Sequence, residues 1–280
     1  MQKLFLAMFG ITITAVLVFF IFEAGQPRME TFRGAFTAAP VPAPEKIPSV
    51  HVVPVDYAAI LKAFRGKDIE FVPTEEKIIA LTIDAGGNAD GVAALAETLT
   101  RLHVPATFFL TGKFMEKFPD AIAALAGAPG GEFANHSYAH LDLTKLTGEG
   151  QREEIKNIEM IARERGIVLA PFFRFPYGAR TAETITATNE LGYTAVRWTV
   201  DSLGWQGMRN GRSVQFVVDR VASGARTGAI VLMHAGSAAD KSTLDADALS
   251  EVIAQLSGQG YRFVTLSELF DASTHGTVSP

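Results

Sequence analysis

The sequence predicts an α/β protein in which parallel strands alternate with helices, and three observations support this fold class. Seven short apolar runs have the composition of buried strands. Helical periodicity fills the gaps between them. Polar side chains follow several of the runs, where a barrel of parallel strands carries its functional residues. Seven such units within residues 77–271 favour a closed barrel over an open sheet.

The predicted strands and helices follow one another in alternation along this domain. The strands are expected at residues 77–84, 106–112, 131–137, 172–176, 193–201, 229–234 and 262–269. The helices are expected at residues 90–103, 114–127, 148–166, 181–191, 212–226 and 245–258. Each strand–helix–strand unit predicts parallel pairing through a helical crossover. Residues 272–280 are expected to form a tail.

The N-terminal segment, residues 1–22, reads as a transmembrane signal-anchor. Its nineteen uncharged residues from Leu4 to Phe22 would span roughly 28 Å as a helix, about one hydrocarbon core. Lys3 precedes the run and Glu23 follows it, which favours an extracytoplasmic location for the rest of the chain. The alternative is a signal peptide that is cleaved to give a secreted protein.

Two further segments separate this anchor from the predicted barrel. Residues 23–50 contain four prolines between positions 40 and 48, which predict a stiff, extended linker. Residues 51–76 form an ambiguous lead-in, in which "HVVPV" and "IEFV" can pair as a short hairpin around a helical turn, "YAAILKAF".

Composition limits the partners and the metal ligands. The chain has 25 Lys and Arg residues against 30 Asp and Glu residues, a net charge of −5, which gives no support to a nucleic-acid partner. It contains no cysteine, which excludes disulfides and thiolate metal sites. Any metal must therefore be held by His, Asp, Glu or Asn.

Polar residues at the C-terminal ends of five predicted strands are expected to meet on one rim of the barrel. They are Asp84, Asn135 with His136, Arg174, Asp201 and His234. The other histidines, His51, His103 and His275, lie away from strand ends and are expected to have packing or surface roles.

The motif "NHSYAH" places His136 and His140 four residues apart, which on a helix would put both rings on one face. Two imidazoles at that spacing can hold one divalent metal, and a structural role is the alternative. A catalytic site needs about three protein ligands, so a third must come from elsewhere, with Asp84 as the first candidate.

Three other strand ends carry candidate site residues. In "RFPYG", Pro176 and Gly178 predict a tight turn, and a buried Arg174 would need a carboxylate partner. His234 ends an apolar strand and can donate a proton to a leaving amine. In "DSLGW", Trp205 either lines a groove for a sugar ring or belongs to the core.

Taken in order, the pieces "TIDAG", "NHSYAH", "RFPYG", "DSLGW" and "LMH" resemble the five motifs of the polysaccharide deacetylase family, carbohydrate esterase family 4. The resemblance covers residues 77–271 and implies a distorted (β/α)7 barrel resembling a TIM barrel. It also implies metal-dependent amide hydrolysis with a divalent ion, often zinc, with cobalt or manganese as alternatives. The products would be acetate and a free amino sugar.

The resemblance also implies roles for individual residues. Asp84 would be the catalytic base, Arg174 would orient it and keep it ionised, and His234 would protonate the departing amine. His136 and His140 would hold the metal. The substrate-binding residues would be Tyr177, through its backbone N–H and its ring, with Trp205 and Asp201.

The chain departs from the family pattern at two positions. Ala85 replaces the metal-binding second aspartate of the first motif, so the third ligand is open among Asp84, Asn88, Asp90 and water. Gly204 replaces the aspartate of the fourth motif that would tune the acid histidine, and Asp201 is a candidate substitute.

We therefore expect a membrane-anchored enzyme that removes N-acetyl groups from amino sugars of a cell-surface polysaccharide. Peptidoglycan is the leading expectation, with N-acetylglucosamine or N-acetylmuramic acid as the sugar. The alternatives are a non-catalytic glycan-binding module with a degenerate metal site, and an amidohydrolase of small non-sugar amides. An exposed Trp205 would favour a polymer, and a rim covered by residues 51–76 would favour a small substrate.

Overall fold

A computed structural model of the chain describes residues 55–275, so the predicted anchor, the linker and the strand-like stretch at 51–55 fall largely or wholly outside the described residues. No helix within the described range is long and apolar enough to cross a membrane. The strands are β1 (Asp68–Ile69), β2 (Ile78–Ala85), β3 (Thr107–Leu110), β4 (Glu132–Asn135), β5 (Leu169–Phe173), β6 (Thr194–Val196), β7 (Val200–Asp201), β8 (Ile230–His234) and β9 (Arg262–Val264).

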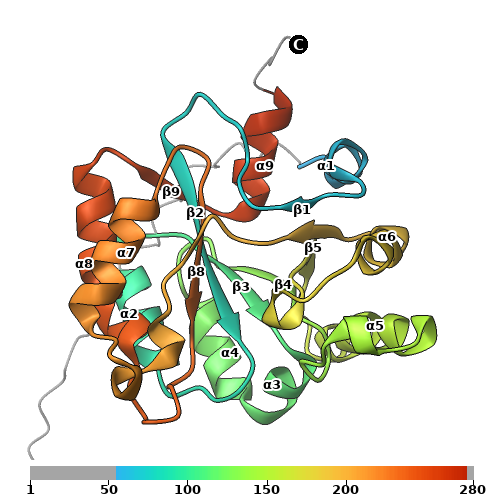
Figure 1. Ribbon diagram of the computed structural model, residues 1–280, viewed down its shortest axis with the longest axis horizontal. Coiled ribbons are helices and arrows are strands. Elements are labelled where there is room, and N and C mark those ends of the chain that lie inside the picture. The colour runs from blue at the N-terminus through green and yellow to red at the C-terminus, as the bar shows by residue number, and fades with distance from the viewer. Residues whose placement is uncertain (1–54, 276–280) are drawn as a thin grey trace, which may run out of the picture. The chain divides into compact units, whose positions relative to one another are not determined.

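The α-helices lie between these strands and at the two ends of the described chain (Figure 1). They are α1 (Tyr57–Phe64), α2 (Val92–Leu102), α3 (Gly112–Lys117), α4 (Pro119–Ala126), α5 (Gly148–Glu164), α6 (Ala182–Glu190), α7 (Val214–Gly224), α8 (Leu244–Gly258) and α9 (Leu266–His275). In Figure 1, α2, α7 and α8 lie together on one side of the strands, and α5 and α6 lie on the other.

The strands form one curled sheet in the order β1-β6-β5-β4-β3-β2-β8-β7, with β9 also paired to β2. All of the strand pairs in this sheet are parallel, as the alternation predicted. One stretch of chain connects the two end regions of this sheet: β6, which pairs with the end strand β1 and with β5, is followed after three residues by the other end strand, β7, which pairs with β8. This arrangement fits a distorted (β/α)7 barrel.

Four predicted elements differ from the structure, two of them for identifiable reasons. The strand expected at 193–201 is divided into β6 and β7, because its two halves pair with different neighbours. The strand expected at 262–269 ends at Val264, and α9 follows. The helix expected at 114–127 is divided at Phe118, since Pro119 starts a new helix and cannot continue the old one. The strand expected at 172–176 lies earlier, at β5.

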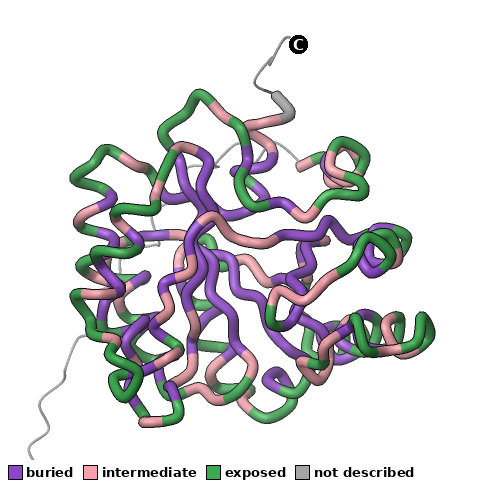
Figure 2. The backbone as a smooth tube through the Cα atoms, viewed as in Figure 1, coloured by how far each residue is buried: buried purple, intermediate pink, exposed green. Residues whose placement is uncertain are grey.

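Successive side chains of β2 point to opposite faces of the sheet, so this strand contributes to two apolar layers. Ile79, Leu81 and Ile83 face the outer helices and pack in the larger cluster of buried residues. Ile78 and Ala80 face the barrel interior, which is filled by a second cluster that includes residues of α9 and α1. The central strands are accordingly buried along their length, while the outer faces of the helices are exposed (Figure 2).

The lead-in segment belongs to the fold over its described part. The expected helical turn is α1, whereas the expected hairpin is wrong in its second half, because β1 pairs with β6. Val72 donates to the carbonyl of Gly228, and Gly228 donates to that of Ile78. These contacts lie at the amino ends of β8 and β2, so this segment covers the end of the barrel opposite to the predicted rim.

Candidate active site

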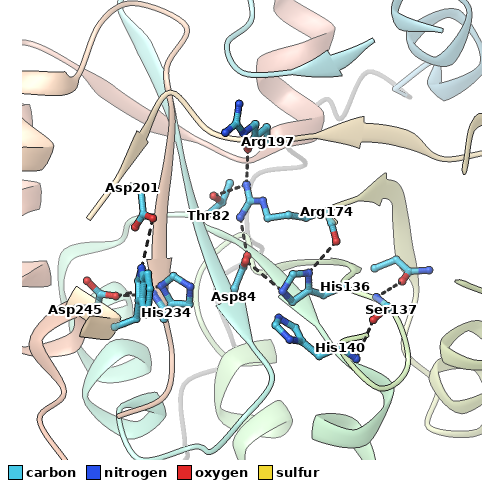
Figure 3. A network of polar contacts seen from close by, with 12 residues as sticks. Thr82, Asp84, His136, Ser137, His140, Arg174, Arg197, Asp201, His234 and Asp245 are labelled. Carbon is cyan, nitrogen blue, oxygen red and sulfur yellow. Dashed lines mark hydrogen bonds and ion pairs between the residues drawn. The ribbon is translucent and has the colours of Figure 1, made fainter. Parts of the chain in front are cut away.

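The carboxyl ends of the strands bring the predicted site residues together. Asp84 on β2 is the register partner of His234 on β8. On the other side, β3 separates β2 from β4, which ends at Asn135, and a bulge there pairs Asn135 with Phe173 on β5. His136 and Arg174 are the next residues of these two strands, so parallel pairing places them on the same rim (Figure 3).

Arg174 and Asp84 form a buried ion pair at the centre of the site. Arg174 is 0 % exposed, and its Nη1 donates to Asp84 Oδ1 at 2.6 Å. Nη2 donates to the Thr82 hydroxyl and to the carbonyl of Arg197 at 2.8 and 2.9 Å. The guanidinium carbon lies 4.0 Å from the centre of the Phe109 ring, a cation–π distance. The carboxylate partner expected for a buried Arg174 is thus confirmed.

This pairing sets the charge of Asp84. Burial is the largest influence and raises its pKa, but Arg174, His136 and His234 together outweigh burial and bring the pKa below its ordinary value. The carboxylate is therefore ionised near neutral pH.

The ring of His136 has a fixed orientation. Its Nδ1 lies 2.9 Å from the carbonyl oxygen of Arg174, and a carbonyl only accepts, so Nδ1 carries the proton. Burial is the main reason that the pKa of His136 is lowered, which keeps the ring neutral. Its Nε2 then presents a lone pair toward Asp84 Oδ2 at 3.3 Å.

His140 lies beside His136, but the helix expected for this pair is wrong. Residues 136–140 form a loop, and the two ring centres are 4.8 Å apart because Ser137 and His140 adopt positive φ angles of 66° and 60°. Such angles are uncommon for residues other than glycine. Burial, followed by the neighbouring His136, lowers the pKa of His140 to about 4, so this ring is also neutral.

The donor chemistry of these three side chains fits a divalent metal ion. His136 Nε2 and Asp84 Oδ2 are two acceptors that face each other, and a cation resolves the conflict between their lone pairs. Neutral imidazole and carboxylate are common zinc donors. Within the described residues, however, no three or more His, Cys, Asp or Glu side chains are already arranged as a metal-binding group.

The other candidates for a third ligand point elsewhere. Asn88 donates to the carbonyl of Ser237 and accepts from its backbone N–H, and Asp90 accepts from the Ser237 hydroxyl. Neither belongs to the residues that line the cavity described below. Ala85 is fully buried in the helix-facing apolar cluster. The expectation that Asn88 or Asp90 completes the metal shell thus finds no support in their contacts.

His234 lies across the site from the two other histidines and has a different electrostatic environment. Burial lowers its pKa, but the adjacent Asp245 carboxylate, together with Asp84 and Asp201, outweighs burial and raises it. Asp245 Oδ2 lies 3.5 Å from His234 Nδ1, and the same oxygen accepts from the His234 backbone N–H at 2.8 Å. His234 is thus the rim histidine that is favoured to carry a proton.

A cavity of ≈ 600 Å³ opens above these groups. Its walls include Asp84, His136, His140, Tyr177, Asp201, Trp205 and His234. The predicted turn at "RFPYG" is confirmed as a 3₁₀ turn with positive φ at Tyr177 and Gly178. Tyr177 is 73 % exposed and Trp205 is 48 % exposed, so both aromatic side chains stand at the mouth of the cavity.

Asp201 does not take the place of the missing aspartate of the fourth motif. Its carboxylate oxygens accept from the Leu203 backbone N–H at 2.8 Å and from the Trp205 indole at 3.4 Å. The carboxylate that contacts His234 belongs to Asp245, which is not among the residues predicted for the site. Asp245 lies in the first turn of α8, forty residues from the fourth motif, and its spacing gives no signal of the contact.

Comparisons with known proteins agree with this fold. A family model described as polysaccharide deacetylase matches residues 71–196. A peptidoglycan-N-acetylglucosamine deacetylase from Bacillus cereus is 30% identical over 201 residues, which are 72% of this chain and 71% of the relative. The peptidoglycan-N-acetylmuramic acid deacetylase PdaA from Bacillus subtilis is 30% identical over 197 residues, 70% of this chain and 72% of the relative.

A solved structure adds a contrasting case. A pseudoenzyme of carbohydrate esterase family 4 from Bacillus anthracis matches with a TM-score of 0.66 and 25% identity, covering 74% of this chain and 70% of its own. Likeness of fold is therefore compatible with loss of activity, and chemical roles depend on the side chains at the rim. From the sequence likeness, the parallel barrel and the rim residues together, we conclude that this chain belongs to the polysaccharide deacetylase family.

Proposed function

We propose that this chain is a metal-dependent N-deacetylase that acts on amino sugars of a cell-wall polysaccharide, with peptidoglycan as the substrate. The observation that carries the proposal is the buried Arg174–Asp84 pair, with His136 and His140 on one side and His234 on the other side of one cavity. Family membership supports deacetylation, and the two Bacillus relatives support peptidoglycan as the polymer.

The side chains of the site can divide the proton transfers of amide hydrolysis between them. Asp84, kept ionised by Arg174, takes a proton from the attacking water. His234, on the neighbouring strand, gives a proton to the amine as the C–N bond breaks. A carboxylate that is ionised and an imidazole whose raised pKa favours its protonated form suit these opposite roles.

The remaining residues bind and orient. His136 and His140 would hold a divalent ion, which when bound would supply Lewis-acid assistance at the acetyl carbonyl. The Tyr177 backbone N–H is proposed to donate to the developing oxyanion. Trp205 and the Tyr177 ring are proposed to flank a sugar ring at the mouth of the cavity, with Asp201 holding the Trp205 indole.

Two features support a polymeric substrate over a small amide. Trp205 and Tyr177 are exposed at the mouth of the cavity, and the described part of the lead-in segment covers the opposite end of the barrel. A long glycan can therefore pass across the open rim. We further propose that residues 1–22 anchor the enzyme in the membrane with the barrel outside the cytoplasm, with secretion after cleavage as the alternative.

Acetate release by the full-length chain tests the proposal. The substrates are N-acetylglucosamine oligomers and peptidoglycan, and the protein is used after metal depletion and after addition of Zn²⁺, Co²⁺ or Mn²⁺. We expect turnover that depends on added metal, and Asp84→Asn serves as the inactive control. Absence of acetate release under all of these conditions, with no bound metal by elemental analysis, would overturn the proposal.

Ala85 favours one second candidate, a glycan-binding module without catalysis. A fully buried methyl group stands where the family places a metal-binding carboxylate, and the contacts of Asn88 and Asp90 give no support to either residue as the missing metal ligand. This candidate predicts glycan affinity that a chelator leaves unchanged, together with absence of acetate release. Glycan binding measured with and without EDTA separates it from the enzyme.

A further inference from the structure

His234 is held by a carboxylate that comes from outside the five motifs. Asp245 is 2 % exposed, and its Oδ2 contacts both the backbone N–H and the ring Nδ1 of His234, at 2.8 and 3.5 Å. Figure 3 shows Asp245 beside His234, on the far side of the site from His136 and His140. Because one oxygen contacts both the main chain and the ring of His234, it can fix where the ring stands.

The space that Asp245 occupies exists only because residue 204 is glycine. A Cβ atom on Gly204 would lie 2.2 Å from Asp245 Oδ1 and 2.6 Å from its Cγ, closer than real Cβ atoms approach other atoms. Gly204 is absent from the described glycines with positive φ, so its backbone does not demand glycine. Space for the Asp245 carboxylate is therefore the physical reason for glycine at this position.

Gly204 is also the position at which the fourth motif departs from the family pattern. An aspartate side chain on residue 204 would begin in the volume that the Asp245 carboxylate now fills. Asp201 does not compete for this role, because its oxygens accept from Leu203 and Trp205. A carboxylate is thus present beside His234, supplied from α8 instead of from the fourth motif.

We propose that Asp245 is the positioning residue of the acid His234. Residues 204 and 245 form an exchanged pair, in which the carboxylate that the family pattern places at position 204 is supplied by position 245 and position 204 is glycine. The inference rests on the proposed deacetylase function for its catalytic consequence. Its geometric part, the steric dependence of residue 204 on residue 245, stands independently of activity.

Conservative replacement of Asp245 is the first test. Asp245→Asn keeps the size and one acceptor oxygen for the His234 N–H but removes the charge that faces Nδ1. We expect kcat for acetate release to fall roughly tenfold to a hundredfold with little change in KM, as for other lost orienting partners. The matched control is Asp247→Asn, an exposed aspartate one half-turn away on α8, which should leave kcat unchanged.

Exchange of the two residues is the sharper test. Gly204→Asp alone should lower both the melting temperature and kcat, because the new Cβ overlaps Asp245. The double variant Gly204→Asp with Asp245→Ala should recover melting temperature and part of kcat relative to each single variant. Gly204→Ala with Asp245→Ala is the packing control, and it should recover melting temperature but not kcat.

The ¹⁵N signal of the His234 imidazole gives a readout that needs no turnover. In the full-length chain labelled at histidine, and with the signal assigned by its loss in His234→Ala, we expect Asp245→Asn to shift the Nδ1 resonance and the exchanged double variant to restore it. An unchanged kcat and an unchanged Nδ1 signal in Asp245→Asn would overturn the proposal, as would additive melting temperatures for Gly204→Asp and Asp245→Ala. If the wild-type chain releases no acetate, the proposed function fails, while the Nδ1 signal and the melting temperatures still decide whether Asp245 positions His234.

Discussion

At the scale of single residues, the site depends on buried charged side chains that are paired with groups of opposite charge. Arg174 is the clearest case, because its guanidinium lies wholly inside the barrel and bonds to Asp84, Thr82 and the carbonyl of Arg197. A buried ion pair contributes little net stability when complete, but removal of one partner leaves an uncompensated charge. Arg174 thus serves both to orient Asp84 and to make its ionisation tolerable.

Replacement of Arg174 by Met should therefore be costly. The variant leaves the Asp84 carboxylate buried without its cation, and we expect the free energy of unfolding to fall by about 3–5 kcal/mol. Urea denaturation measures the loss. Arg262→Met is the matched control, since Arg262 and Glu76 form an exposed pair at 2.9 Å, which should contribute less than about 1 kcal/mol. Equal losses in the two variants would contradict this account of Arg174.

The three rim histidines should separate into two functions. His136→Ala removes the Nε2 that faces Asp84, so bound metal should fall. His234→Ala should keep its metal but slow acetate release by roughly a hundredfold to ten-thousandfold, the usual contribution of a general acid. Elemental analysis and the acetate assay distinguish these outcomes. Full metal content in both variants would show that the ligand assignment is wrong.

At the scale of elements, the loops at the rim carry most of the unusual backbone. Five of the six described non-glycine residues with positive φ lie in loops that follow the carboxyl ends of strands, namely Ser137, His140, Tyr177, Leu203 and Lys241. Backbone of this kind persists only where its surroundings fix it, and it is frequent at functional sites. The loop that carries His140 is fixed from α5, because Glu154 accepts from the Ala139 N–H at 2.8 Å through its side chain and from the Tyr138 N–H at 2.8 Å through its carbonyl.

Truncation of Glu154 should loosen that loop without touching a predicted ligand. In Glu154→Ala the Ala139 N–H loses its partner, and we expect metal affinity to fall roughly tenfold to a hundredfold, as for other groups that orient ligands. Titration with Zn²⁺ measures the affinity. Glu153→Ala changes the exposed neighbour on the same helix and should have no effect. A similar loss in both variants would point to general destabilisation of α5 instead.

At the scale of the whole described domain, the end of the barrel opposite to the site is closed by α9 and a polar cluster. Glu132 at the start of β4 accepts from the Thr107 hydroxyl at 2.8 Å and from the Ser267 hydroxyl on α9. Burial raises the pKa of Glu132, and the neighbouring Glu268 adds to this, against the lowering by its hydrogen bonds to Ser267 and Thr107. The active site and this cluster therefore lie at opposite ends of the same strands.

The raised pKa of Glu132 makes stability depend on pH in a known direction. A carboxyl group with a folded-state pKa above its unfolded value binds protons more tightly when folded, so its stabilising effect is complete below the unfolded value and is lost as pH rises through the folded one. Relative to wild type, Glu132→Gln should therefore become more stable as pH increases from the ordinary carboxyl range upward. Urea denaturation over a pH series measures the difference in the free energy of unfolding between the two proteins, and a difference that stays constant with pH would contradict this account of Glu132.

Much of the fold and of the site follows from the sequence alone. The amphipathic helices show their hydrophobic periodicity directly in the sequence. The same holds for strand β2, whose alternate residues pack against the helices and in the barrel interior. The sequence also predicted that the polar residues at the strand ends lie on one rim, because parallel strands have their carboxyl ends on the same side. The position of Arg174 after an apolar strand predicted that its side chain is buried. A buried charge requires a partner, so the sequence also predicted a carboxylate beside it.

The tertiary structure decided what depends on residues distant in the chain. The separation of residues 194–201 into β6 and β7 reflects two different pairing partners, which no local pattern records. The approach of His136 to His140 depends on a loop fixed by Glu154, and not on helical spacing. The carboxylate beside His234 comes from Asp245 because glycine at position 204 leaves room for it. A sequence displays periodicity along the chain, but side chains from separate elements become neighbours only when the barrel packs.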